Sequence, residues 1–218
     1  MAPSEPSRPT LLRGEAKIGR QDAEEDSMTL PQEAIELINV LAKGGFETPE
    51  RVVEIICEEA YEPGELDANE VAGSVRQAFR ALQAEMRAWP EITDCDRLDQ
   101  VFAVLNSKGI VSVQNAGYTQ SDGFDAVKEA ARGRPDRNGL TGYCFYHGQD
   151  LERAISGAGL YLAFGPKSAA REEQDGPLIG AIIVEQLQGA GIGTEWNGSF
   201  GQRIHCPRLD WKRRPVAG

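Results

Sequence analysis

The sequence predicts an α+β protein: an N-terminal helical segment packed on a small mixed β-sheet of about five strands, with helices on one or both faces. Two observations predict it. In the first part of the chain, apolar residues recur at helical spacing between stop signals rich in glycine and proline. After residue 90, short runs of β-branched and aromatic residues alternate with helical stretches, which is typical of strands and helices packed in layers.

Three helices are expected before residue 91. The first begins after Leu30 and stops at Gly44-Gly45. The second begins at Thr48, which can cap it, and is followed by proline in the first turn; Pro63-Gly64 ends it. The third and longest covers about 67–89 and is closed by Pro90.

The rest of the chain alternates between helices and strands. Helices are expected over 93–105, 124–131, 150–156 and 177–188. Strands are expected over 110–113, 142–146, 160–164, 192–196 and 203–206. Asn197-Gly198 is a strong hairpin signal that would join the last two strands. Residues 116–123 are expected to form a polar loop.

Composition divides the chain into three parts. Residues 1–29 are rich in Pro, Ser and charged residues and contain few apolar anchors, so we expect a disordered tail. Residues 30–90 would form a helical subdomain, and residues 91–214 the α+β domain.

The charge of the chain restricts its partners. The net charge is −11, from 34 acidic and 23 basic residues among 218. Binding to nucleic acid or to an anionic membrane needs a basic face, so we expect neither. The acidic balance fits either a basic protein partner or simple solubility. The oligomeric state is not indicated.

Cysteine usage and hydropathy predict a cytoplasmic protein. The four cysteines are scattered, with no C-x-x-C pair and no metal-ligand spacing, which favours reduced thiols and no metal site. The first residues lack the apolar core of a signal peptide, and no apolar run is long enough to cross a membrane.

Four blocks of sequence carry a family resemblance. They are W-P, T-D-C-D-R-L and G-I-V within 89–111; G-Y-C-F-Y-H, Q-D and E-R-A within 142–154; G-L-Y-L-A-F-G at 159–165; and W-N-G-S, R-I and L-D-W within 196–211. Together they resemble an uncharacterised bacterial family, a domain of unknown function, over roughly residues 31–214. The resemblance implies no activity.

The candidate site is the polar turn that follows the strand over 142–146. His147, Gln149 and Asp150 lie where this strand gives way to a helix, a common place for a site. Tyr146 and Tyr118 could line a pocket beside them. A histidine within reach of a carboxylate can act as a general base. The alternative is structural, with Asp150 capping the helix and His147 half-buried and bonded to backbone.

No other residue carries a catalytic signature. His205 alternates with apolar neighbours and is expected to be structural. The glycines of 189–193 follow a helix and precede a strand, which is the wrong order for a phosphate loop, so we expect no cofactor. Near the C-terminus, Trp211 is expected to pin the chain to the core, with the arginines after it in solvent.

These observations favour a cytosolic, non-enzymatic interaction or regulatory module with an acidic surface. The alternative is a small enzyme or ligand-binding protein with a polar site around His147–Asp150. This alternative requires the two side chains to approach each other in a concave pocket.

Overall fold

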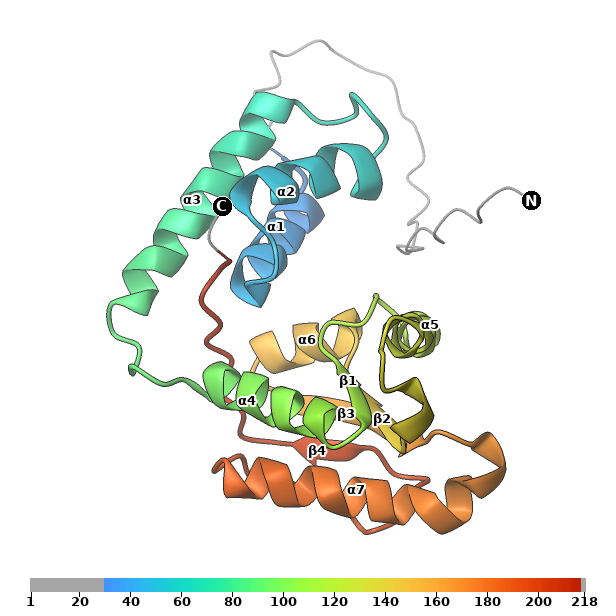
Figure 1. Cartoon of the computed structure of the whole chain (residues 1–218). Coiled ribbons are helices and arrows are strands. Elements are labelled where there is room, and N and C mark those ends of the chain that lie inside the picture. Colours follow the sequence, from blue (N-terminus) through green and yellow to red (C-terminus); the bar gives the residue numbers. More distant parts are fainter. Residues whose placement is uncertain (1–29, 217–218) are drawn as a thin grey trace, which may run out of the picture. The chain divides into compact units, whose positions relative to one another are not determined.

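The computed structural model describes residues 30–216, which form two compact units (Figure 1). The helical unit ends at Glu85 and also takes in the described residues from Pro215 onward, and the sheet unit spans Met86–Arg214. The boundary expected from the sequence lay between residues 90 and 91. The tail expected to be disordered, residues 1–29, lies outside the described residues.

Four helical segments form the helical unit. They are α1 (Gln32–Gly44), α2 (Pro49–Glu54), η1 (Ile55–Ala60) and α3 (Ala68–Met86). Thr48 caps α2 as expected, because its hydroxyl accepts a hydrogen bond from the Arg51 N–H at 3.2 Å. The buried core of the unit contains Ile38, Val52, Ile56, Val71, Val75 and Phe79.

The second predicted helix is not a uniform α-helix. After Glu54 its backbone widens into the π-helix η1, where the Tyr61 N–H donates to the Ile56 carbonyl five residues earlier, at 3.3 Å. The π-helix ends at Ala60, before Pro63-Gly64. Sequence spacing could not distinguish the two helix types because η1 is only six residues long.

The sheet unit contains a four-stranded mixed sheet, which confirms the fold class. Its strands, in spatial order, are β1 (Ile110–Val113), β2 (Gly142–Phe145), β3 (Leu160–Pro166) and β4 (Ile204–Cys206). The β1 and β2 strands are parallel, and the two following pairs are antiparallel. β1 and β4 are therefore the edges of this sheet.

The expected fifth strand, residues 192–196, is wrong. Only one bridge forms there, between Glu195 and His205. Trp196 packs edge-on against Phe164 at 5.6 Å, and its Nε1 donates to the carbonyls of Ser199 and Gln202 at 2.9 and 3.1 Å. These contacts hold a wide loop around Asn197-Gly198 and leave no two-residue hairpin.

Helices cover both faces of the sheet. They are α4 (Asp94–Ser107), α5 (Gln120–Arg132), α6 (Gly148–Ile155) and α7 (Glu172–Gly189). Phe145 lies against Gly123 of α5, and Phe164 lies against Gly180 of α7. Phe164 pairs with Cys144, the neighbour of Phe145 in β2, so the two phenylalanines point to opposite faces. Figure 1 shows α6 and α7 on opposite sides of the sheet.

Two helices begin earlier than expected. α5 starts at Gln120, inside the stretch 116–123 expected to be a loop, because Thr119 and Asp122 form a capping box. α7 starts at Glu172, so that Pro177 lies inside the helix, where it removes one intrahelical hydrogen bond.

Candidate functional site

The candidate site lies at the carboxyl ends of the parallel strands β1 and β2. The loops that follow these strands are joined by backbone hydrogen bonds. Ala116 N–H donates to the Tyr146 carbonyl, and Gly148 N–H to the Gly117 carbonyl, both at 2.8 Å. Helices α5 and α6 begin from these loops. In α/β proteins this is where ligands bind, because two helix N-termini converge there.

The structure brings His147 and Asp150 together in the interior. His147 is 4% exposed and Asp150 1%. The imidazole Nε2 lies 3.1 Å from Asp150 Oδ2, and the same oxygen accepts the His147 backbone N–H at 3.3 Å. Arg203 Nη2 also donates to this oxygen and, at 3.1 Å, to the Tyr161 carbonyl. Asp150 therefore links the start of α6 to Arg203, the residue just before the edge strand β4.

Burial lowers the pKa of His147. Its effect exceeds that of the Asp150 carboxylate, which favours the protonated ring, and Arg203 lowers the pKa further. The imidazole is therefore neutral at pH 7. The His147 side chain is 5% exposed, so its ring has little access to solvent.

The carboxylates of the chain itself occupy both helix N-termini. Asp122, in the first turn of α5, accepts the backbone N–H of Thr119 at 2.8 Å, and this bond leads the causes that lower the pKa of Asp122. Asp150 does the same for α6. The loops are also tightly packed: a Cβ on Gly148 would lie 2.8 Å from the Tyr118 ring, and one on Gly117 2.3 Å from Asp122. An anion would find these N-termini already used.

The remaining predicted site residues do not join His147 and Asp150 in a pocket. Gln149 is exposed, and its backbone N–H donates to the Tyr118 carbonyl at 3.3 Å. The Tyr118 phenol is half-buried, which raises its pKa, and the nearby Glu152 carboxylate raises it further. Tyr146 is fully buried and donates its hydroxyl to Gln114 at 3.0 Å. The functional role of these residues stays a prediction.

The second histidine belongs to the same chain of contacts. The His205 ring stacks on Tyr161 at 4.1 Å, and its Nδ1 lies 3.3 Å from Glu195 Oε2. The Arg203 guanidinium lies 5.5 Å from the centroid of the Tyr161 ring. Contacts therefore run from His147 through Asp150, Arg203 and Tyr161 to His205. Sequence reasoning missed Arg203 because no local pattern links residues so far apart.

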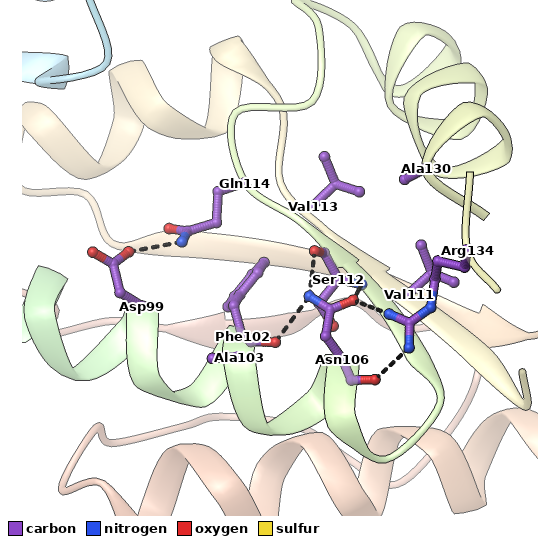
Figure 2. Close-up of a pocket in the computed structure, with 10 residues that line it drawn as sticks. All are labelled: Asp99, Phe102, Ala103, Asn106, Val111, Ser112, Val113, Gln114, Ala130 and Arg134. Carbon is purple, nitrogen blue, oxygen red and sulfur yellow. Dashed lines mark hydrogen bonds between the residues drawn. The ribbon is translucent and has the colours of Figure 1, made fainter. Parts of the chain in front are cut away.

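A pocket lies elsewhere, at the free edge of β1 between α4 and the end of α5 (Figure 2). Its volume is about 500 Å³. The lining residues are Asp99, Phe102, Ala103, Asn106, Val111, Ser112, Val113, Gln114, Ala130 and Arg134. None of them was predicted as a site residue, because nothing in the sequence shows which strand forms an edge.

The C-terminal segment borders this pocket. Arg213 Nη2 donates to Asp99 at 2.6 Å and to Gln114 at 2.8 Å, and Arg214 Nη1 donates to Asp96 at 2.9 Å. Trp211 packs edge-on against Tyr146 at 6.0 Å, as an anchor would. The expectation that the arginines lie in solvent is wrong for Arg213, whose side chain is 12% exposed and is bound by Asp99 of α4, whereas Arg214 is exposed and pairs with Asp96.

Together the fold and the site define an α+β protein with an internal histidine–carboxylate pair and a pocket at one edge of its sheet. In the described part of the chain, no group of three or more His, Cys, Asp or Glu could hold a metal ion, and no helix is long and apolar enough to span a membrane. The family model described as "Domain of unknown function (DUF6891)" matches residues 27–215, so the chain belongs to this family. No curated protein and no solved structure matches the chain.

The internal histidine predicts that stability falls as the pH drops from about 7 to 5. The unfolded chain protonates His147 near the ordinary pKa of about 6.5, whereas the folded state, with its lowered pKa, does not. The unfolded state then binds more protons, so the free energy of unfolding decreases with falling pH, by at most about 1.4 kcal/mol per pH unit. Urea denaturation at several pH values measures this slope.

Two variants separate His147 from the other titrating groups. His147→Gln should flatten the slope in this window, whereas His205→Gln should keep it. Asp96 and Asp122 have lowered pKa values, so the stability they contribute is lost only below about pH 4, outside the window. An unchanged slope in His147→Gln would show that the imidazole is not held neutral.

Proposed function

We propose that the chain is a non-enzymatic interaction module of the cytosol, and that the acidic surface of its helical unit binds a basic protein partner. The observation that carries this proposal is the placement of charge. Residues 30–85 contain 12 acidic and 4 basic side chains, a net charge of −8 within a chain of −11. About a quarter of the chain thus holds most of its excess charge.

The charge is concentrated further around η1 and the start of α3. No lysine or arginine lies between residues 52 and 75. Seven carboxylates lie in this stretch and all are exposed: Glu54, Glu58, Glu59, Glu62, Glu65, Asp67 and Glu70. The nearby Arg51 is already bound, at 3.0 Å by Glu54 and at 2.5 Å by Glu59. A basic partner would therefore face an almost uncompensated negative surface.

The carboxylates of this negative surface help to raise the pKa values of neighbouring side chains. Burial raises the pKa of the Cys57 thiol, and Glu58 and Asp67 raise it further. Burial likewise raises the pKa of Tyr61, with Glu33 and Glu65 adding to it. Residues that are separated along the chain thus contribute to one negative potential, which steers oppositely charged partners and speeds their association.

Two further observations support a module of the cytosol without catalysis. All four cysteines are free thiols, and three of them are buried. Burial raises the pKa of Cys95 and of Cys206 to about 12, so neither is a reactive thiolate. The imidazole of His147, the best candidate for a general base, is enclosed. The enzyme alternative needs an open pocket beside this ring.

The test is charge reversal on the acidic surface of the full chain. Glu58, Glu62 and Glu70 are exposed, and the ion pairs that Arg51 makes in this part of the described chain use Glu54 and Glu59 instead, so changing all three to Lys keeps those contacts. Affinity capture identifies a partner, and titration then measures it. We expect the triple variant to weaken binding by about a hundredfold, and added salt to weaken binding of the unaltered chain steeply.

A matched control carries the same change of charge on the sheet unit. Glu129, Glu173 and Glu185 are also exposed, and changing all three to Lys should leave binding within about threefold of the unaltered chain. The proposal fails if capture yields no partner above a bait-free control. It also fails if the partner binds the helical-unit variant as well as the unaltered chain.

A further inference from the structure

The β1 strand is an edge of the sheet, and the backbone groups of Ser112 point outward from it. The Gly109 carbonyl accepts the Thr141 N–H at 2.9 Å, so it points toward β2. Backbone groups alternate in direction along a strand, and Ser112 lies three residues further on. Its N–H and C=O therefore point away from the sheet, where a fifth strand would pair.

A side chain already occupies that position. Asn106 Oδ1 accepts the Ser112 N–H at 3.0 Å, and Asn106 Nδ2 donates to the Ser112 carbonyl at 2.9 Å. The amide thus makes the same two bonds as the paired residue of an antiparallel neighbouring strand. Arg134 holds it, with Nη1 on Asn106 Oδ1 at 2.9 Å and Nη2 on the Asn106 carbonyl at 2.8 Å. Edges protected in this way resist unwanted pairing.

The pocket of Figure 2 lies along the same edge. Phe102 and Ala103 of α4 form one wall, Ala130 of α5 contributes to the other, and residues 111–114 form the floor. Four residues of strand span about 13 Å. The two alanines leave room on both sides of the edge. The pocket therefore has the position and the walls of a slot for one added strand.

We propose that this slot binds an extended peptide segment of a partner protein, which pairs with the free edge of β1 and replaces the Asn106 amide on Ser112. Each end of the slot already holds an ion pair. Arg134 Nη2 pairs with Asp136 at 2.7 Å at one end, and Asp99 pairs with Arg213 at 2.6 Å at the other. The segment that fits therefore has small apolar side chains and needs no charged residue at either end.

The probe is a displayed library of random short peptides, selected on the full chain. Counter-selection uses the variant Ala103→Trp, whose indole fills the slot from an exposed position of α4. We expect enriched peptides with small apolar side chains at their centres. Their affinity should fall at least about tenfold on Ala103→Trp and should not change on Ala84→Trp, an exposed position of α3.

Hydrogen exchange of the Ser112 amide tests the replacement step. In Asn106→Ala this amide should exchange faster than in the unaltered chain, and an enriched peptide should restore its protection. If Asn106→Ala does not fold, the Ala103→Trp comparison still decides. The proposal is overturned if no peptide is enriched over counter-selection, or if enriched peptides bind Ala103→Trp equally well. Neither outcome depends on the acidic surface of the helical unit.

Discussion

Replacing Asp150 by alanine is expected to lower the free energy of unfolding by about 3 kcal/mol. The Asp150 side chain is 2% exposed, and removing it leaves the His147 ring and the Arg203 guanidinium without their acceptor. Breaking a buried pair costs about 3–5 kcal/mol, and Arg203 remains 32% exposed, so solvent recovers part of the loss. The α6 cap is lost as well, at about 1 kcal/mol. Urea denaturation followed by tryptophan fluorescence measures the change.

Two comparisons show whether the loss comes from an uncompensated charge. The double variant Asp150→Ala with Arg203→Ala should be no less stable than Asp150→Ala alone, because the stranded cation is removed. Asp125→Ala breaks an exposed pair with Lys128 on α5 and should cost about 0.5 kcal/mol or less. A loss this small in Asp150→Ala would mean that the network does not hold α6 in place.

Local signals accounted for the parts of the site that the sequence could predict. His147 and Asp150 are three residues apart at a helix start, where a side chain reaches the backbone of the cap. The functional interpretation placed His147 within reach of the carboxylate, and the structural one made Asp150 the helix cap. Arg203 is a third partner that neither interpretation included: it ties Asp150 to the sheet, and it is 53 residues distant along the chain. No short-range pattern could identify it.

The same limit explains the errors in the fold. The mixed sheet and its helices follow from apolar periodicity, which is local. The expected fifth strand rested on Asn197-Gly198, a turn signal that acts only when the flanking residues are free to pair. Trp196 instead packs on Gly180 and Phe164, where a side chain on that glycine would lie 2.6 Å from the indole. Tertiary packing therefore overrode a strong local preference.

The slot at β1 was beyond sequence reasoning for a different reason. The sequence predicts a helix over 93–105, which ends just before Asn106. In the structure Asn106 is the next-to-last residue of α4, and its amide binds the sheet edge. An asparagine near a helix end can bond the backbone of an adjacent strand only where that strand is unpaired. Which strand is unpaired is known only from the topology of the folded sheet.

Replacing Gly123 by alanine is the second change with a large expected effect on the free energy of unfolding. Helix propensity and core packing act in opposite directions, and their balance gives the sign of the effect. In the interior of α5 alanine is favoured over glycine by about 1 kcal/mol. The added Cβ, however, would lie 2.1 Å from Cε2 of Phe145, a ring that is fully buried and packed on Phe124 at 5.2 Å. Overpacking a rigid core costs about 1–3 kcal/mol, and this overlap is severe. We expect a net loss of about 2 kcal/mol in the free energy of unfolding.

Gly189→Ala is the matched control, because this glycine also lies in a helix of the sheet unit but faces open space, with no atom within 4 Å of its Cβ position. That variant should be neutral or up to about 1 kcal/mol more stable. Chemical denaturation of both variants, followed by tryptophan fluorescence, isolates the packing term, since the backbone change is the same. Equal stabilities would mean that α5 can shift away from β2 at little cost. The predicted gap of about 2–3 kcal/mol would instead show that Gly123 sets the closest approach of α5 to the sheet, and with it the position of the α5 wall of the slot.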